Sequence, residues 1–214
     1  MATVGKSLGD HEIQHHAQAR YFQNPLLEKL SKTPGWSPLV VWVPIFGLLM
    51  YQAAVDTALS GAEITLLALA GVVFWSLAEY WLHRKFFHWT WPKRLHYIIH
   101  GAHHIYPDDN GRVVFPPTAS LMLGAMFYLL FLLVLGYAAT LPFFAGFVAG
   151  YLWYDMTHFW THVAKPKSRY GKYLRRHHML HHFSEPDKKF GVSSPVWDFV
   201  FGTYGKSARK GDAG

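Results

Sequence analysis

Histidine is the residue of this chain whose abundance and spacing could do chemistry. Fifteen histidines occur among 214 residues, and there is no cysteine. The pattern His-x-x-His-His appears twice, at residues 100–104 and 178–182. Imidazole binds zinc, copper, iron and nickel, and without thiolates only imidazole and carboxylate remain as strong metal ligands. The sequence therefore indicates a histidine-bound metal site, and the spacing alone leaves the metal open.

Helical spacing selects ten of the histidines as candidate ligands. His158 and His162 are four residues apart, so they share one face of a helix, and the same holds within each His-x-x-His-His motif. His83 and His88 are five residues apart, about 140° on an ideal helix, so we expect the helix to end or unwind near His88. A lone histidine is usually a hydrogen-bonded core residue, but two triplets beside two pairs favour metal binding. The predicted ligands are His83, His88, His100, His103, His104, His158, His162, His178, His181 and His182.

These histidines form a repeat. Each half of the chain supplies an acid, Glu79 or Asp155, three or four residues before its first histidine, then a histidine pair and a histidine triplet. We therefore expect a pseudo-twofold arrangement in which each half contributes five histidines. A mononuclear zinc hydrolase needs only three protein ligands. Ten neutral imidazoles indicate two metal ions with about five histidines each and an open position on at least one of them.

The charges show which elements must position the histidines. All twenty Lys and Arg residues fall within 1–37, 83–118 and 161–214, and the intervening spans are strongly apolar. An apolar helix of about 20 residues crosses a bilayer, and positive residues mark its cytoplasmic side. We predict an all-α integral membrane protein in which four transmembrane helices form two hairpins under a cytoplasmic, histidine-rich metal-binding cap. The expected helices span about 39–59, 64–82, 119–137 and 141–160.

The predicted organisation has one main domain. Residues 1–37 form a cytoplasmic or interfacial arm, whose three histidines are expected at the surface. Residues 38–204 form the domain, with the cap at 83–118 and 161–204, and residues 205–214 form a flexible tail. A soluble helical bundle is disfavoured because soluble helices carry a charged face. The net charge of +7 comes with no recognised nucleic-acid-binding module, so no nucleic-acid partner is expected.

Longer motifs carry a resemblance to a known family. The segments HGAHHIYPDDNGRVVFPP, YDMTHFWTH and HHMLHHF, the last followed by FGVSSPVWDFVFGT, closely resemble the fatty acid 2-hydroxylases. These enzymes belong to the membrane fatty acid hydroxylase/sterol desaturase superfamily, and the similarity runs from about residue 79 to 204. Carried over position by position, the family's metal ligands fall on the same ten histidines. His96 and His177 are left over, in structural roles or beside the ligands.

The resemblance implies an enzyme and its cofactor. It implies a non-haem di-iron monooxygenase that uses O2 and two electrons to hydroxylate carbon 2 of a fatty acyl chain. Zinc can replace iron in purified protein because it binds such sites tightly. Glu79 and Asp155 are expected to orient histidine N–H groups, since such partners fix metal ligands. Tyr154 and Asp155 are expected where the substrate carbonyl or head group approaches.

The resemblance also bears on partners and leaves alternatives open. About 37 residues precede the first predicted helix, where many eukaryotic relatives carry a haem domain. We therefore expect a separate electron donor, either a cytochrome b-type haem protein or a ferredoxin. The basic segment 165–176 could bind such a donor or anionic lipids. The acyl substrate could be a free acid, a thioester or a ceramide-type lipid, in a bacterial plasma membrane or the endoplasmic reticulum.

Other functions fit the same histidines. A sterol-methyl oxidase or a carotenoid hydroxylase would share every predicted ligand and differ in its product. A metal transporter or a structural zinc protein of the membrane would bind metal without consuming O2. Transport sites lie near the middle of the bilayer, whereas the histidines are predicted at one membrane face, so the hydroxylase is favoured.

Overall fold

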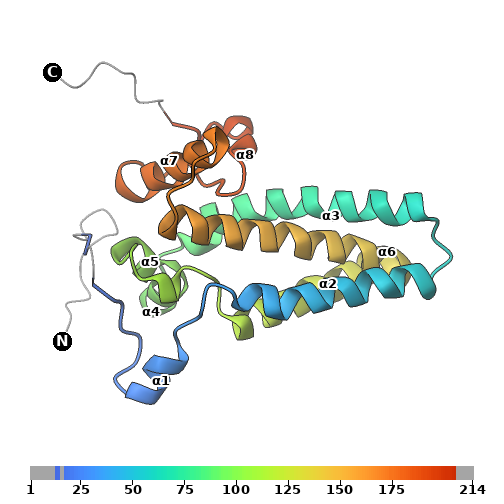
Figure 1. Ribbon diagram of the computed structural model, residues 1–214, viewed down its shortest axis with the longest axis horizontal. Helices are drawn as coiled ribbons and strands as arrows, with labels where there is room; N and C mark the ends of the chain where they lie inside the picture. Colours follow the sequence, from blue (N-terminus) through green and yellow to red (C-terminus); the bar gives the residue numbers. More distant parts are fainter. Residues whose placement is uncertain (1–12, 15–16, 206–214) are drawn as a thin grey trace.

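The computed structural model describes residues 13–14 and 17–205, and all of their regular structure is helical (Figure 1). The three arm histidines and most of the predicted tail lie outside these residues. Two π-helical segments, Leu82–Phe87 and Tyr97–Gly101, and a 3-10 turn at Asn110–Arg112 interrupt the α-helices. The α-helices are α1 (Pro25–Leu30), α2 (Ser37–Val55), α3 (Gly61–Trp81), α4 (Lys93–His96), α5 (Ala102–Ile105), α6 (Pro117–Val163), α7 (Arg169–Phe183) and α8 (Val196–Val200).

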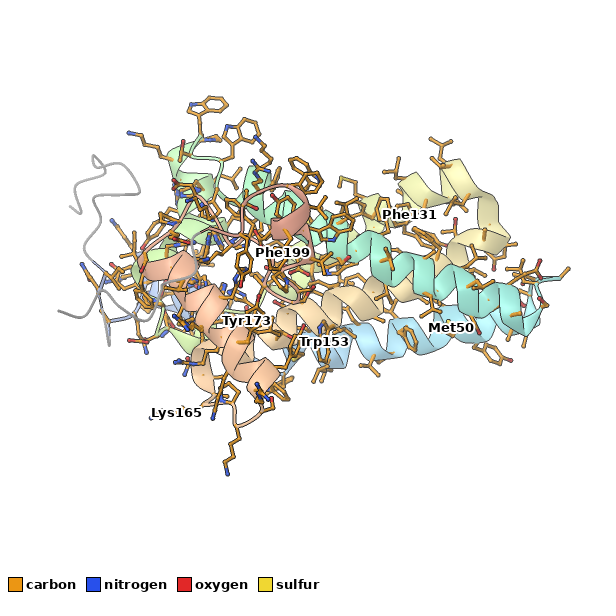
Figure 2. The ribbon with its side chains drawn as sticks, turned by 90° about the horizontal axis from the view of Figure 1, so that it is seen from above. Met50, Phe131, Trp153, Lys165, Tyr173 and Phe199 are labelled. Carbon is orange, nitrogen blue, oxygen red and sulfur yellow. The ribbon has the colours of Figure 1, made fainter. Side chains whose placement is uncertain are left out.

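Three helical segments are long and apolar enough to cross a membrane, Ser37–Val55, Gly61–Phe87 and Asn110–Val163. They run side by side, and α4, α5 and α7 gather at one end of this bundle (Figure 1). Figure 2 shows Lys165 at that end, whereas the apolar side chains of Met50 and Phe131 lie along the bundle. Many large apolar side chains point outward from the bundle; Met122 is 76% and Leu133 85% exposed. Such an outer surface suits lipid rather than water.

The first joint between the long helices lies earlier than the sequence predicted. Helix α2 ends at Val55 rather than near 59, and α3 begins at Gly61 rather than 64. Ser60 sets this start, because its hydroxyl accepts the Glu63 N–H and the Glu63 carboxylate accepts the Ser60 N–H. This capping box satisfies backbone donors that would otherwise lack partners. The expected boundaries followed hydropathy alone, which does not register a cap.

Helix α6 folds back on itself. A straight helix of 47 residues would be about 70 Å long. The ring centroids of Phe131 and Phe143 are only 5.0 Å apart, and those of Phe127 and Phe147 4.9 Å. The reversal occurs at Gly136, whose φ of 74° is a conformation that glycine adopts at little cost. It divides α6 into antiparallel arms, 117–135 and 137–163, whereas the predicted joint at 138–140 is helical.

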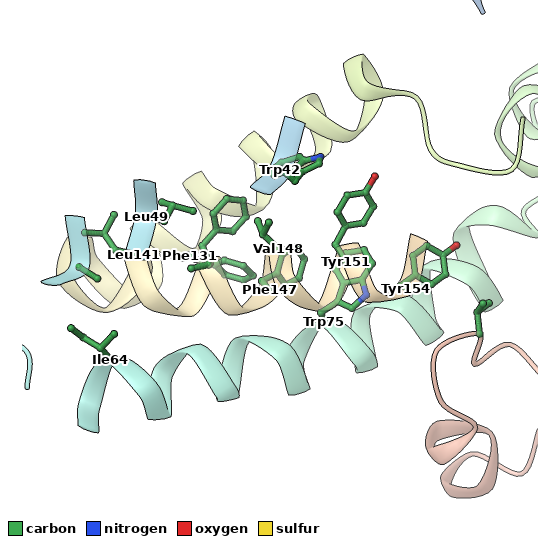
Figure 3. Close-up of a cluster of buried hydrophobic side chains, with 14 residues drawn as sticks. Trp42, Leu49, Ile64, Trp75, Phe131, Leu141, Phe147, Val148, Tyr151 and Tyr154 are labelled. Carbon is green, nitrogen blue, oxygen red and sulfur yellow. The ribbon is translucent and has the colours of Figure 1, made fainter. Parts of the chain in front are cut away.

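Helix α3 packs very closely against the second arm of α6. A Cβ atom on Gly146 would lie 1.8 Å from the Ala68 carbonyl oxygen, and one on Gly71 would lie 1.9 Å from that of Phe143. Small residues at such positions let helix backbones approach in membranes. The buried side chains along this contact, Trp75, Phe147 and Tyr151 among them, form the core between the helices (Figure 3).

Replacement of Gly146 tests the close approach of α3 and α6. Gly146→Ala should lower the free energy of unfolding by about 1–3 kcal/mol, because the new methyl group meets backbone that has no flexible end to move. Gly47→Ala is the matched control, since nothing lies within 4 Å of a Cβ atom there. Thermal unfolding of the two variants in the same detergent measures the difference. Equal stabilities would contradict the tight α3–α6 contact.

Candidate metal centre

The fold gathers the ten selected histidines into two groups of five. Within each group, one ring nitrogen from every histidine lies within 4.8 Å of the others. The groups adjoin each other, and the rings of His104 and His182 stack across them at 4.3 Å. The first group is His83, His88, His100, His104 and His181, and the second is His103, His158, His162, His178 and His182.

Each group draws on both halves of the chain. His103 from the first motif joins the histidines of the second half, and His181 from the second motif joins those of the first. The exchange is symmetrical, because both residues occupy the fourth position of His-x-x-His-His. On a helix this position lies about 100° from the fifth. The first and fifth histidines can therefore face one metal while the fourth faces the other.

A change of helix type brings His83 and His88 together. The chain leaves α3 through a π-helix at Leu82–Phe87, and His88 follows that helix with non-helical backbone angles. A π-helix bonds each residue to the fifth one along the chain, so residues at this spacing become neighbours. The two rings lie 5.1 Å apart. The helix thus unwinds where the five-residue spacing required it.

The separations between ring nitrogens fit a metal ion. Neighbouring Nε2 atoms lie 2.9–3.1 Å apart in both groups. Ligands on bonds of about 2.1 Å would be about 3.0 Å apart at right angles and about 3.4 Å apart in a tetrahedron. The observed values match right angles, as expected for more than four ligands. The pairs are His83–His100, His100–His104, His88–His181, His103–His158, His162–His178 and His178–His182.

Backbone carbonyls fix the orientation of several rings. The Nδ1–H of His83 donates to the Phe190 carbonyl at 2.6 Å, that of His181 donates to Lys188 at 2.6 Å, and that of His162 donates to Pro107 at 3.0 Å. The Nε2 atoms of these rings therefore carry lone pairs that point into the groups. Lone pairs that converge at about 3 Å repel one another unless a cation lies between them. The donor set thus fits two metal ions.

Burial keeps the histidines neutral. Outside the apolar segments, burial together with the charge of neighbouring imidazoles lowers the pKa of the histidines in the two groups, and that of His104 falls to about 3. Neutral imidazole is the form that binds metal. The other histidines whose pKa is lowered well below the ordinary value for these two reasons are His100, His103, His178, His181 and His182.

The carboxylates expected to orient histidines contact other groups. Glu79 accepts the N–H groups of Val192 and Ser193 at 2.9 and 2.8 Å. Asp155 accepts the Tyr151 hydroxyl at 3.0 Å and the Phe115 N–H at 3.3 Å. Their hydrogen bonds therefore hold backbone and tyrosine rather than imidazole, which corrects the expected contact. For His83, His162 and His181 the reason is geometric, since backbone carbonyls already take their N–H groups.

Tyr154 lies beside the second group. It is buried, and its ring stacks on that of His158 with centroids 5.9 Å apart. On its other side it contacts the ring of Trp75 at 5.8 Å. Tyr154 therefore joins the apolar core to the histidines.

The sequence reasoning missed Asp198, which holds the loop beside the first group. Its buried carboxylate accepts the N–H groups of Phe190 and Gly191, both at 2.9 Å, and the Thr203 hydroxyl at 2.8 Å. The His177 Nε2–H donates to it at 3.0 Å. The signal was a single acid within the apolar run VWDFVF. Asp198 thus places the Phe190 carbonyl that orients His83.

Replacement of Asp198 tests its role in holding the loop. Asp198→Asn should lower the free energy of unfolding by about 2–3 kcal/mol, because an amide cannot accept from all of the surrounding donors. It should also weaken metal binding by about tenfold or more through the displaced loop. Thermal unfolding and metal analysis measure both effects. Asp187→Asn, at an exposed acid of the same segment, should change neither, and an equally stable, fully metallated Asp198→Asn protein would contradict the assignment.

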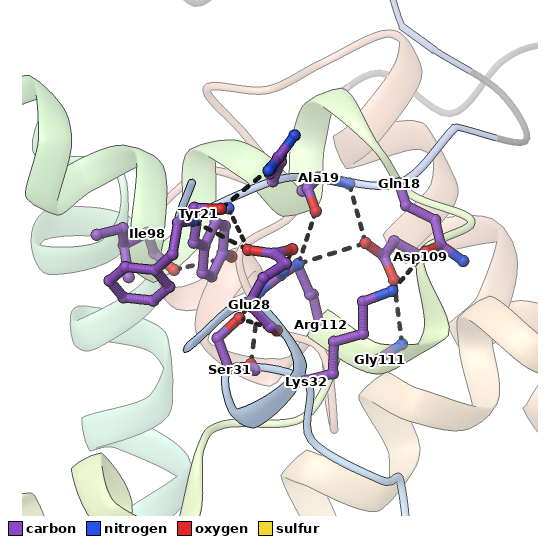
Figure 4. Close-up of polar contacts among 12 residues, drawn as sticks. Gln18, Ala19, Tyr21, Glu28, Ser31, Lys32, Ile98, Asp109, Gly111 and Arg112 are labelled. Atoms are coloured by element: carbon purple, nitrogen blue, oxygen red, sulfur yellow. Dashed lines mark hydrogen bonds and ion pairs between the residues drawn. The ribbon is translucent and has the colours of Figure 1, made fainter. Parts of the chain in front are cut away.

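Arg112 is a second residue missed in the sequence, and it ties the N-terminal arm to the cap (Figure 4). Its guanidinium forms ion pairs with Glu28 and Asp109 and donates to the Ala19 carbonyl, and it lies 3.6 Å from the centre of the Tyr21 ring. Burial, partly offset by Arg112, raises the pKa of Tyr21 to about 12. Among the described residues that precede α2, only Pro25–Leu30 is helical. The described arm is therefore packed against the cap.

Two cavities meet beside the histidines. One, here called the apolar cavity, is a partly open space of about 480 Å³ between α2, α3 and α6 that extends from Phe87 and Tyr154 to Phe144. The other, the polar cavity, is a partly open space of about 490 Å³ under the arm. It is lined by Tyr21, Thr33 and Arg112, and by His100, His103 and His158 from both groups. Phe87, Phe115 and Tyr154 line both cavities. A long molecule with one apolar and one polar end could therefore pass the histidines.

The chain is similar to known proteins in sequence and in fold. Residues 68–203 match the family described as fatty acid hydroxylase. The dihydroceramide fatty acyl 2-hydroxylase FAH2 of Arabidopsis thaliana is 37% identical over 188 residues, which cover 86% of this chain and 79% of the relative. The fatty acid 2-hydroxylase of Homo sapiens is 36% identical over 209 residues, which cover 86% of this chain and 56% of that protein. The solved structure of full-length scs7p, in which only the hydroxylase domain is visible, matches with a TM-score of 0.83 and 36% identity. That match covers 89% of this chain and 74% of the solved one.

Proposed function

The chain belongs to the fatty acid hydroxylase family, and on this premise we propose that it hydroxylates carbon 2 of fatty acyl chains in a membrane. The observation that carries the proposal is the pair of five-histidine groups, reached from a polar cavity that continues into an apolar one. Hydroxylation is oxidation, so the protein is an oxidoreductase. The balanced reaction is R–H + O2 + 2 e⁻ + 2 H⁺ → R–OH + H2O.

Two iron ions would be held by the ten histidines, five each. When bound, they supply the activation of O2 that an unreactive C–H bond requires. Neutral imidazoles add no negative charge, so the centre stays more cationic than a carboxylate-rich site. Zinc binds such sites tightly, so its presence in purified protein would be compatible with iron in the cell.

The protein itself binds and orients the substrate. The acyl tail would lie in the apolar cavity and the carbonyl end in the polar cavity, with carbon 2 at the shared rim of Phe87, Phe115 and Tyr154. Asp155 supports this rim through the Phe115 N–H. Glu79 and Asp198 hold the loop whose carbonyl orients His83. Apolar walls exclude water, and positioning of this kind supplies much of the catalysis.

The membrane arrangement follows from the apolar helices. The proposed topology has four spans in two hairpins, α2 with α3 and the two arms of α6. The cap, 83–118 and 161–204, and both termini would lie on the cytoplasmic side of a plasma membrane or of the endoplasmic reticulum. Residues 1–37 would remain outside the bilayer as an arm, and 205–214 would form a tail.

Electrons would come from a separate carrier protein, either a cytochrome b-type haem protein or a ferredoxin. The segment 165–176 carries six cations, and no acid occurs between Asp155 and Glu185. Lys165, Lys167 and Lys172 are exposed. An acidic carrier would be attracted to this surface, and such attraction weakens as salt is added.

Mass spectrometry of hydrolysed lipids tests the proposal. A host that expresses the chain with a compatible reductant should accumulate 2-hydroxy acyl chains, and a host that expresses His178→Ala should not. The intact parent lipid would identify the substrate as a free acid, a thioester or an amide. Hydroxylated sterol or carotenoid in place of 2-hydroxy acyl chains would refute the proposed substrate. Protein that binds metal without any product would favour a transport or structural role.

A further inference from the structure

The walls of the apolar cavity are two facing helical stripes. The first arm of α6 contributes positions 120, 123, 124 and 127, and the second contributes 144, 147, 148, 151 and 154. Both sets follow the spacing of one helix face. Trp42 of α2 and Trp75 of α3 close the sides. The cavity therefore runs as a channel along the axis of the α6 hairpin.

The lining suits a hydrocarbon. Most of its polar groups are engaged within the protein: the Trp42 Nε1–H donates to the Ser120 hydroxyl at 3.1 Å, that hydroxyl donates to the Pro117 carbonyl at 3.0 Å, and the Tyr151 hydroxyl donates to Asp155. The Trp75 Nε1–H is buried without a hydrogen-bond partner. The other lining residues are predominantly large and apolar. A polar ligand would find few partners here, whereas a flexible alkyl chain would need none.

Aromatic rings close the deep end of the channel. The rings of Phe127 and Phe144 lie 4.9 and 5.8 Å from that of Phe147. Phe131 packs behind Phe147 at 5.3 Å and does not line the cavity. Phe131 is only 5% exposed. The channel therefore has a solid floor well before the turn at Gly136.

The rise per residue of helix α6 gives the depth of the channel. Tyr154, at the rim, and Phe144, at the floor, are ten residues apart on α6. This corresponds to about 15 Å at 1.5 Å per residue. An extended alkyl chain advances about 1.3 Å for each carbon–carbon bond of about 1.5 Å. The channel thus holds about twelve carbons beyond carbon 2.

We propose that the floor of Phe127, Phe144 and Phe147 limits the length of the acyl chain that the enzyme hydroxylates. The proposal rests on the 2-hydroxylase function and deepens it. Chains of about 14 carbons would fill the channel with carbon 2 at the rim. In a longer chain the methyl end would meet the floor, and carbon 2 would then lie beyond the rim instead of at it. Each excess methylene then costs about tenfold in kcat/KM, the usual scale for a methylene in an apolar pocket.

Substitutions at one floor position test the proposal in both directions. Phe127 is half-buried, so its replacement disturbs the fold less than that of Phe144 or Phe147. Purified protein with a chemical reductant is given an equimolar mixture of saturated acyl chains of different lengths. Phe127→Ala should shift the ratio of long to short products upward by about tenfold, and Phe127→Trp should shift it downward. Opposite shifts from one position cannot arise from general damage to the fold.

Phe143→Ala is the matched control. Phe143 is half-buried in the same aromatic cluster, 5.0 Å from Phe131, but does not line the cavity. Its removal should leave the product ratio unchanged. If neither Phe127 variant shifts the ratio while the unmodified protein makes 2-hydroxy acids, the length limit is refuted and the function stands. If the unmodified protein makes no 2-hydroxy acid from any chain, the function itself fails.

A binding measurement locates the tail without turnover. A fatty acid with a photoreactive group at its methyl end should label the floor residues Phe127, Phe144 and Phe147 after irradiation. Phe127→Trp should reduce this labelling by severalfold for a long probe and leave a short probe unaffected. Labelling confined to the outward faces of the helices, at Met122 or Leu133, would place the tail in the surrounding lipid or detergent and overturn the proposal.

Discussion

Replacing either His181 or His103 by alanine is expected to abolish hydroxylation and to remove one of two bound metal ions. Each residue contributes one of five converging nitrogens to its group. Loss of a partner that merely orients a ligand already costs about 10–100-fold. Loss of the ligand itself should cost more than about 100-fold in activity and leave one site empty. Elemental analysis of purified protein gives the number of metal ions per chain.

Double variants separate grouping in space from grouping in sequence. His83→Ala with His181→Ala should lose only one metal, because both histidines belong to the first group although they are far apart in the chain. His103→Ala with His104→Ala should lose both metals, because these adjacent histidines belong to different groups. The reverse pattern, with both metals lost from the first pair and one from the second, would mean that the groups are assigned wrongly.

His96 supplies the matched control for this experiment. It is a buried histidine that belongs to neither group, and its Nδ1–H donates to the Phe87 carbonyl at 3.0 Å. His96→Ala should therefore keep two metal ions per chain, even if the protein unfolds at a lower temperature. A loss of metal as large as that of His103→Ala would show that metal analysis reports general damage rather than ligation.

Removal of the metals is the second change with a large expected effect. Without cations, the lone pairs of ten imidazoles, seven of them buried, converge where α5, α7 and the end of α6 meet, with neighbouring Nε2 atoms about 3 Å apart. Structural zinc stabilises small domains by about 10–16 kcal/mol. A strong chelator should therefore open the cap while the apolar bundle, which has its own core, stays helical.

Limited proteolysis measures this opening. Lys172 and Arg176 lie exposed on α7, but a protease must unfold the helix before it can cut there. Chelation should raise cleavage at these sites by more than about 100-fold, since cleavage follows the population of the open form. Circular dichroism should retain most of the helical signal, and added iron or zinc should restore protection. A cap that stays resistant after complete metal removal would contradict the proposed structural role of the metals.

The sequence located most of the site because ligand chemistry is local. The spacings of three and four within His-x-x-His-His, and of four between His158 and His162, are properties of any helix. They selected the ten histidines that the fold then brings together. The five-residue spacing of His83 and His88 correctly indicated an interruption of the helix, which is the π-helix. Histidines at one end of apolar segments also fixed the end of the bundle at which the site lies.

Contacts between distant segments were beyond the sequence reasoning. Glu79 and Asp155 were expected to touch histidine, but they hold Ser193 and Phe115 instead. Asp198 and Arg112 were overlooked because each is a single polar residue whose partners lie elsewhere in the chain. Helix boundaries also shifted, since hydropathy does not register the Ser60 cap or the reversal at Gly136.

By itself, the sequence determined the residue types, their helical spacing and the family, and with these the all-helical fold and the prediction of a histidine-bound metal. The tertiary structure decided how the histidines divide, with His103 and His181 exchanged between the halves. It also decided which carbonyls orient the rings and where the two cavities meet. The physical reason is that periodicity fixes a residue's place on its own helix. The rotation and position of one helix relative to another come only from packing.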